Sequence, residues 1–200
     1  MSAMFKKPLP LALAALLCSI GLALGYSVTH NAPETTTVRL PLAHIQAADA
    51  LASNAQTYYA ESKDFGGITV KILADGRQLP AAFMLSGTAE NPTLKNAWGG
   101  FVFVLDGSMG DSTPPVGTST AGFARIVHTG VPAADCMGFI QGIESHAAAV
   151  SVAAESTPLT PPLLLTTVKA LNGSINQVAT QKACAGTGTK TVMMMVKHRA

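Results

Sequence analysis

Three cysteines, Cys18, Cys136 and Cys184, are the residues whose chemistry is easiest to narrow down. Cysteines can bind zinc or join in pairs as a disulfide. A zinc site needs further ligands close by, and the sequence has no Cys-x-x-Cys pair and no paired histidines. Cys18 lies in an apolar run near the N-terminus, which leaves two cysteines for the rest of the chain. Behind an export signal such an even number predicts a disulfide between Cys136 and Cys184.

An acidic turn after an apolar strand is a second candidate for chemistry. Phe101 to Gly110 resembles the metal-binding start of a von Willebrand A domain, Asp-x-Ser-x-Ser, with Asp106 and Ser108 in matching positions. Gly110 stands where the second serine would coordinate magnesium, and the chain after Asp106 is too short for that doubly wound fold. A short motif without its context is mostly coincidence. We therefore predict a strand and a polar turn here, without a metal.

A serine near two histidines is the third candidate. The segment 117–122 resembles a nucleophile elbow only loosely, because Ala121 stands where a glycine belongs. His128 and His146 are the nearest candidate bases, and neither lies in a recognisable catalytic stretch. Serines and threonines in such loops usually form turns. We therefore predict no catalytic, cofactor-binding or metal-binding residues, and no enzyme.

The composition excludes further classes of function. The chain has 200 residues, of which 12% are charged, and a net charge of +2. Its basic residues do not cluster beyond Lys6 and Lys7, which argues against a nucleic-acid partner. No small-molecule substrate is indicated either. The length suits one domain with a short appendage, and the apolar content suffices for a core.

Residues 1–30 have the features of an export signal. Two lysines precede an uncharged run over residues 8–26, and no acidic residue appears before Glu34. Positive residues ahead of an apolar run place the N-terminus in the cytoplasm and the rest of the chain outside. Two interpretations remain open. The run is either a signal peptide cleaved between Gly25 and Tyr26, or a retained membrane anchor. As an anchor, its length is near the lower end of the about 17 to 25 residues that a helix needs to span a bilayer.

The elements that follow are a linker, a helix and a sheet. Residues 31–41 contain Pro33 and three consecutive threonines, which disfavour helix and indicate a linker. Pro41 suits a first helical turn. From Leu42 to Tyr59, apolar residues recur at steps of three and four, which predicts a helix lying across a sheet.

Alternation and turn residues predict strands over residues 101–105, 122–129, 148–153, 163–170 and 190–195. Residues 67–73 are compatible with a strand or a helix. Further helices are expected from residue 131 to about residue 145, and in a short segment capped by Ser174 that carries Cys184 and ends at Gly186. The pattern indicates an α+β fold.

The only tryptophan, Trp98, is followed by two glycines at the start of the clearest strand. Gly99 and Gly100 remove side chains where the backbone must turn or approach another segment closely. We expect Trp98 to be mostly buried against the long helix or the first strand. Together with Tyr59, these residues are predicted to belong to the structural core.

The order of these segments resembles the type IVb pilins, the family of the toxin-coregulated and R64-type thin-pilus subunits. The resemblance covers Ala47 to Met195 and includes three motifs: Asn-Ala-Trp-Gly-Gly at 96–100, Gly-Val-Pro-Ala-Ala-Asp-Cys at 130–136 and Ala-Cys-Ala-Gly at 183–186. It implies a long helix on an antiparallel sheet and one C-terminal disulfide. It also implies a structural or accessory subunit of a pilus or secretion system, acting through surfaces in assembly, adhesion or conjugation.

The N-terminus departs from that family. Pilin precursors carry a glutamate at the fifth position of the mature chain, and residues 8–26 contain none. A charge in lipid needs a partner, and in the family that partner is a neighbouring N-terminal amine during assembly. A different function therefore stays open, in which a cleaved periplasmic or secreted binding module keeps the pilin-like head and does not polymerise.

The resemblance also implies partners and a location. The partners are other pilin or pilus-assembly subunits, and the inner membrane through residues 1–30. The globular domain is expected over residues 42–200. It is expected to be exported across the bacterial inner membrane, as a membrane-anchored periplasmic, pilus-associated or secreted protein.

Overall fold

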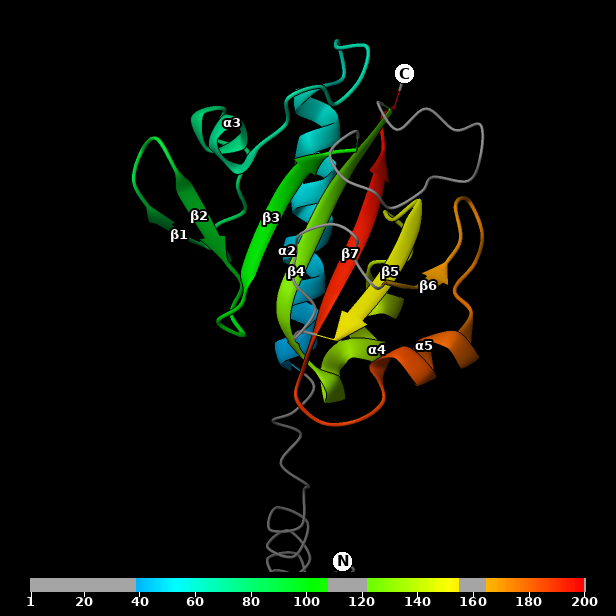
Figure 1. The fold of residues 1–200 in the computed structure, drawn as a ribbon. Helices are drawn as coiled ribbons and strands as arrows, with labels where there is room; N and C mark the ends of the chain where they lie inside the picture. Colours follow the sequence, from blue (N-terminus) through cyan, green and yellow to red (C-terminus); the bar gives the residue numbers. More distant parts are fainter. Residues whose placement is uncertain (1–38, 108–121, 155–164, 200) are drawn as a thin grey trace, which may run out of the picture. The chain divides into compact units, whose positions relative to one another are not determined.

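The structure is a computed structural model that describes residues 39–107, 122–154 and 165–199. The described residues all belong to one unit, which begins at Arg39 (Figure 1). The expectations for residues 1–30, for the linker up to residue 38 and for Cys18, Gly25 and Tyr26 lie outside the described residues. Among the helices that are described, none is both long and apolar enough to cross a membrane.

The longest described helix is α2 (Arg39–Tyr58), and it packs on the sheet as predicted. It begins within the segment that the sequence indicated as a linker, so Pro41 lies in its first turn, where proline is tolerated. Figure 1 shows α2 crossing behind β4 and β7. The side chains that α2 buries completely recur at helical spacing: Ala48, Leu51, Ala52 and Ala55.

Within the described residues, seven strands form one antiparallel sheet in the order β1-β2-β3-β4-β7-β5-β6. Their bounds are β1 (Met84–Gly87), β2 (Pro92–Lys95), β3 (Phe101–Asp106), β4 (Phe123–Pro132), β5 (Ala149–Ala154), β6 (Thr166–Lys169) and β7 (Thr189–Lys197). The last described strand, β7, therefore lies inside the sheet, between β4 and β5. A helix packed on an antiparallel sheet confirms the predicted α+β fold.

Two parts of the first half of the chain differ from the sequence prediction or go beyond it. The ambiguous stretch 67–73 contains a helix, α3 (Val70–Asp75), which Thr69 caps by accepting a hydrogen bond from the backbone N–H of Ile72 at 3.2 Å. The strands β1 and β2, which the sequence did not indicate, form a hairpin at one edge of the sheet (Figure 1).

Two helices of the second half have other bounds than predicted. The predicted helix from residue 131 is α4 (Ala133–Gly142), because β4 continues to Pro132. The predicted cap Ser174 is wrong. Asn176 caps α5 (Gln177–Cys184), and its side-chain Oδ1 accepts a hydrogen bond from the backbone N–H of Ala179 at 3.0 Å.

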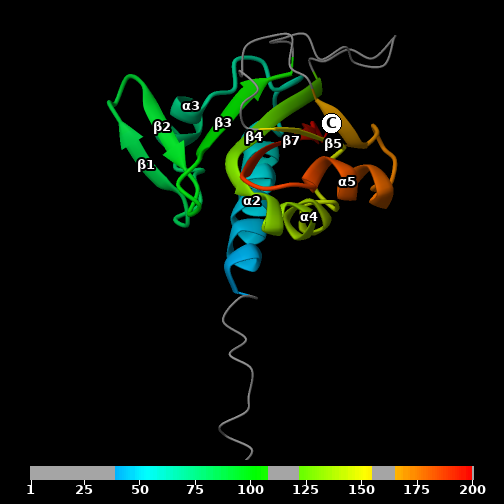
Figure 2. The same cartoon turned by 60° about the horizontal axis from the view of Figure 1, so that its bottom comes forward.

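The hydrophobic core lies between the sheet and the helices α2 and α4. Figure 2 shows these two helices on the same side of the sheet. They approach closely where Gly142 of α4 meets Ile45 of α2, since a Cβ atom at Gly142 would overlap the Ile45 side chain. The inner face of β3 contributes Val102 and Val104 to this core.

Candidate functional site

The turn between β2 and β3, residues 96–100, is closed by the buried side chain of Asn96. Its Oδ1 accepts a hydrogen bond from the backbone N–H of Gly100 at 3.0 Å, and its Nδ2 donates to the carbonyl of Thr129 at 2.9 Å. A second link is the backbone N–H of Phe101, which donates to the Thr129 hydroxyl at 2.8 Å. The turn is therefore fixed to β4 by hydrogen bonds on both sides of its tip.

The two glycines of this turn meet different structural constraints. Gly99 has a φ of 85°, a left-handed conformation that other residues adopt at a cost. Gly100 lies against the backbone of β4, and a Cβ atom there would overlap the carbonyl of Thr129. Gly130, with a φ of 71°, faces Gly100 at this point, where the register of β4 against β7 shifts between His128 and Val131.

The turn presents Trp98 to two helices. Trp98 is half-buried, and its ring lies 3.7 Å from the ring of His44 on α2, centroid to centroid, and 5.3 Å from that of Phe139 on α4. The indole Nε1–H donates a hydrogen bond to Oδ2 of Asp135 at 3.1 Å. The Trp98 turn thus connects α2, the sheet and the beginning of α4. The expectation that Trp98 acts as a core residue stays a prediction, which a stability measurement tests.

Two buried histidines lie in this part of the core. Burial lowers the pKa of His128 to about 3, and a smaller part of this shift comes from the electrostatic repulsion of His44. Burial also lowers the pKa of His44, while the Asp135 carboxylate opposes that effect. The Nε2 atoms of both rings are buried without a hydrogen-bond partner. Both imidazoles are therefore neutral near pH 7, and they act as packing groups beside Phe139, whose ring centroid lies 5.1 Å from that of His128.

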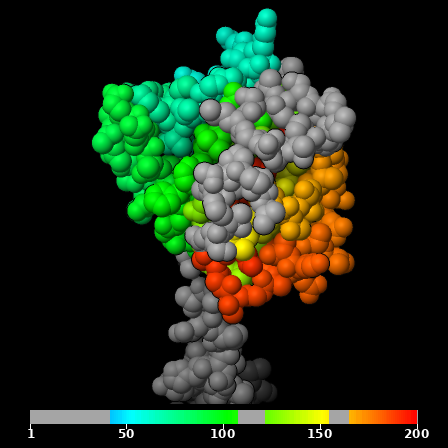
Figure 3. All heavy atoms as spheres, viewed as in Figure 1, coloured from blue at the N-terminus to red at the C-terminus, as the bar shows by residue number. Residues whose placement is uncertain are grey.

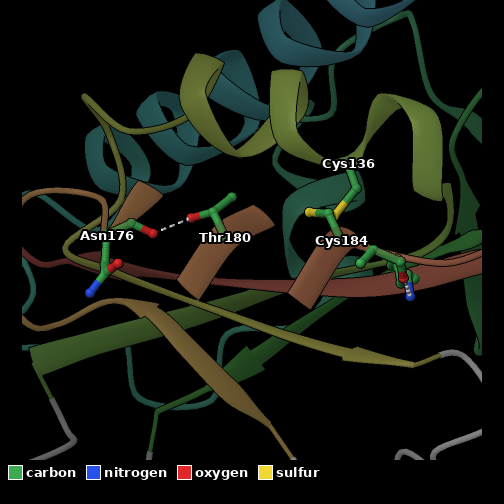
Figure 4. Close-up of a disulfide and its surroundings, with 6 residues drawn as sticks. Cys136, Asn176, Thr180 and Cys184 are labelled. Atoms are coloured by element: carbon green, nitrogen blue, oxygen red, sulfur yellow. Dashed lines mark hydrogen bonds between the residues drawn. A yellow bond between two sulfur atoms is a disulfide. The ribbon is translucent and has the colours of Figure 1, made fainter. Parts of the chain in front are cut away.

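The disulfide begins next to the Trp98 contacts, because Cys136 follows Asp135 on α4. Cys136, the neighbour of Asp135 on α4, is bonded to Cys184 on α5, and the two Cα atoms are 5.6 Å apart (Figure 4). The predicted pair is thereby confirmed. One turn before Cys184, the hydroxyl of the fully buried Thr180 donates a hydrogen bond to the carbonyl of Asn176 at 2.8 Å. The disulfide therefore holds α5 against α4, and α5 also packs against β6.

The other candidates for chemistry do not converge. Ser108, Gly110 and residues 117–121 lie outside the described residues. His128 is enclosed in the core, whereas His146 lies in the loop after α4, with its Nδ1 at 3.0 Å from Oδ1 of Asp49. Among the described residues, no group of three or more histidine, cysteine, aspartate or glutamate side chains could hold a metal ion.

Tyr59 is buried, and the rings of Tyr59 and Phe65 are 5.6 Å apart.

The outer face of the β1–β3 edge, drawn in green in Figure 3, carries exposed apolar side chains. Met84 pairs with Lys95, and Lys95 pairs with Phe101, so the three side chains form one row across the strands. Met84 is 60% and Phe101 41% exposed, and the Lys95 Nζ lies 5.4 Å from the centroid of the Phe101 ring. Leu105 extends the apolar surface along β3. We call Met84, Lys95, Phe101 and Leu105 the outer row. Exposed apolar patches of this kind often mark contacts between proteins.

The sequence reasoning missed His44, Asp135 and the outer row. His44 lies four residues before Ala48 on the apolar face of α2, so a polar residue at a core position was the available signal. For Asp135 no signal existed, because its partner Trp98 is 37 residues away. The outer row depends on the register of β1 and β2, which were not predicted.

Comparisons with known proteins agree with this architecture. The family model described as PilS N terminal matches residues 42–197. A type IVb pilin from Salmonella typhi is similar in structure, with a TM-score of 0.54 at 16% sequence identity; the match covers 78% of this chain and 98% of that one. TcpA, a type IV pilin from Vibrio cholerae El Tor, has a TM-score of 0.50 at 14% identity, with the same coverage of both chains. No curated protein sequence matches significantly.

Proposed function

Since this chain belongs to the PilS family of type IV pilins, we propose that it is a subunit of a type IV pilus or of a related secretion system. Its role in this proposal is structural or accessory, and it is carried by surfaces, without catalysis. The observation that supports it most is the family match over residues 42–197, which includes all of α2 except its first three residues, every strand of the described sheet and both cysteines of the disulfide.

The physical properties of the head suit that role. A subunit that is exported and then exposed needs a fold that resists unfolding outside the cell, and disulfides are a common means in such compartments. Here the disulfide joins two helices that pack on the sheet, so it stabilises the second half of the chain as one block. The proposed partners are other pilin-family subunits, and the proposed location is the envelope or a pilus outside the inner membrane.

We assign the outer row as a contact with a neighbouring subunit. Its apolar members are exposed on the described surface, and together they offer area that is favourable to remove from water. Lys95 in the middle of the row gives that contact a polar anchor that favours an acidic or carbonyl partner. Since the row lies on the sheet face opposite the core side chains Val102 and Val104, changing it leaves the core intact.

A second function is favoured by the N-terminal sequence. Residues 8–26 contain no glutamate, which subunits of this family carry for assembly. In that case the chain is a cleaved periplasmic or secreted binding module that keeps the pilin head. The two functions differ in the mature N-terminus. A chain that begins at Tyr26 and never appears in sheared filaments is a non-polymerising module, whereas an N-methylated residue from a cut before the apolar run identifies an ordinary pilin.

The test combines sequencing of the mature N-terminus with two variants. Phe101→Asp places a charge in the outer row, and Val178→Asp places one at another exposed apolar position, which is 77% exposed on α5. We expect Phe101→Asp to remove the protein from the filament fraction, with a thermal stability close to that of the wild type, and Val178→Asp to leave its amount there unchanged. Equal amounts of both variants in that fraction would exclude the outer row as the contact.

A further inference from the structure

A polar pocket of about 400 Å³ opens at the end of the sheet where β7 stops, close to the C-terminus marked in Figure 1. Its wall combines the end of α2, the loop between α4 and β5, the turn after β6 and the end of β7. The residues that matter for its chemistry are Gln56, His146, Lys169, Asn172, Lys197 and Arg199. A volume of several hundred Å³ is in the range of small-molecule sites.

The charge of the pocket has one sign. Lys169, Lys197 and Arg199 line it, and no aspartate or glutamate is among its lining residues. Within the described part of the chain, none of these three cations forms an ion pair with a carboxylate. Two acidic side chains lie beside the wall and already have partners: Asp49 lies 3.0 Å from the lining residue His146, and Oε1 of Glu144 accepts a hydrogen bond from the backbone N–H of Ile175 at 3.0 Å. Among the described lining residues, positive charge is therefore in excess.

The wall is held in place by hydrogen bonds. The largely buried Lys169 is fixed by its Nζ, which donates to the carbonyl of Glu144 at 2.6 Å. An ammonium has three donors, so Lys169 can also donate to a ligand. The turn after β6 is tied to the loop before β5 by the backbone N–H of Asn172, which donates to the carbonyl of Ala148 at 2.9 Å. A site with a fixed wall loses little entropy when it binds.

Gln56 adds a requirement for a hydrogen-bond donor in the ligand. It is 7% exposed, and its Nε2 donates to the carbonyl of Lys197 at 2.8 Å. Its Oε1 is buried without a partner, which is costly for an acceptor. Gln56 lines the pocket, so a turn of its side-chain amide would present this oxygen to a ligand with an N–H or O–H donor. Positive charge alone would suit any anion, whereas this acceptor favours an anion that also carries donors.

We propose that this pocket binds a small organic anion in which a carboxylate or sulfate is accompanied by hydroxyl or amide donors, as in an acidic monosaccharide. The anionic group lies among Lys169, Lys197 and Arg199, and a donor of the ligand reaches Oε1 of Gln56. The outer row takes no part in this site, so the inference is independent of the contact proposed between subunits.

The test uses the purified full-length chain with three probes: glucuronate, glucose and inorganic sulfate. Isothermal titration gives the affinity, and amide NMR shifts at Asn172 and Gly173 give the location. We expect glucuronate to bind and to shift these amides, and glucose not to bind. A Lys197→Gln, Arg199→Gln double variant should bind glucuronate about tenfold more weakly or worse, since charge-assisted hydrogen bonds are lost. The matched control, Lys63→Gln with Lys182→Gln, changes exposed lysines elsewhere and should bind like the wild type.

A further variant separates the sugar acid from a simple anion. Gln56→Met should weaken the binding of glucuronate and leave that of sulfate unchanged, provided that its thermal unfolding resembles the wild type. Lys197→Gln with Arg199→Gln keeps the proposal testable if Gln56→Met does not fold. Binding of glucose as tight as that of glucuronate would overturn the proposal, and so would an equal loss of affinity in the control double variant. Sulfate binding as tightly as glucuronate would reduce the pocket to an inorganic-anion site, which also contradicts the proposal.

Discussion

Acid should destabilise this protein through His128. The side chain is 1% exposed, and burial lowers its pKa in the folded state to about 3, from an ordinary value of 6.5. Below pH 6.5 the unfolded chain therefore binds a proton at this residue that the folded chain does not bind. The contribution to stability is complete above pH 6.5 and is lost as the pH falls toward 3.

The size of the effect follows from the two pKa values. At pH 4.5, protonated His128 exceeds neutral His128 about a hundredfold in the unfolded chain. In the folded chain, His128 stays almost entirely neutral at this pH. The free energy of unfolding should then be lower than at pH 7.5 by about 3 kcal/mol from His128 alone. The carboxylates of the protein add their own pH dependence, so the contribution of His128 has to be measured as a difference between variants.

The assay is urea unfolding followed by circular dichroism at pH 7.5 and pH 4.5. His128→Leu removes the titrating group, so its loss of stability between the two pH values should be smaller than that of the wild type by about 3 kcal/mol. Ile126→Leu is the control, because it changes packing at another buried position of β4 without a titrating group. If His128→Leu and the wild type lose the same free energy, His128 is not a neutral buried group and the reasoning is refuted.

Three further predictions concern stability. Cys136→Ser opens a disulfide that joins positions 48 residues apart, and should lower the free energy of unfolding by about 4 kcal/mol on the chain-entropy model; mass spectrometry of non-reduced peptides that found Cys136 and Cys184 as free thiols would contradict it. Gly100→Ala should cost more than Gly99→Ala in thermal melts, because the first meets backbone that cannot move aside and the second mainly requires a left-handed φ, at about 1 to 2 kcal/mol; the reverse order would contradict the packing of the turn. Trp98→Ala should cost about 3 kcal/mol in urea unfolding, the lower end for large aromatics, because Trp98 is half-buried; wild-type stability would identify it as a surface contact.

The parts of the fold that the sequence predicted correctly have a strong local pattern. β3 alternates between buried Val102 and Val104 and the more exposed residues on either side, and α2 repeats its apolar residues at helical spacing. The hairpin of β1 and β2 lacks such a pattern. All four residues of β1 are exposed, and β2 begins with Pro92, which argues against a strand except at an edge. Only the paired register shows that these residues form an edge hairpin.

The cap of α5 shows a second limit. Ser174 and Asn176 are both good cap residues, and the sequence does not distinguish them. The structure does, because Ile175 still forms a bridge with Lys169 of β6, so the chain at Ile175 is extended and the helix begins after Asn176. The candidate site has the same limit. The turn at Trp98 follows from Trp-Gly-Gly, whereas its partners His44 and Asp135 come from two different helices and depend on tertiary packing.

The position of β7 in the sheet determines when the head can be completed. In the described sheet, the β1–β4 part and the β5–β6 part are joined only through β7, which pairs with β4 on one side and β5 on the other. A chain emerging from a translocation channel therefore cannot close its sheet until Thr189–Lys197 has passed through. By then both cysteines of the disulfide have passed too, so oxidation can follow sheet closure instead of preceding it. For a chain that is exported as proposed above, this topology leaves the sheet open until the last described strand has crossed the membrane.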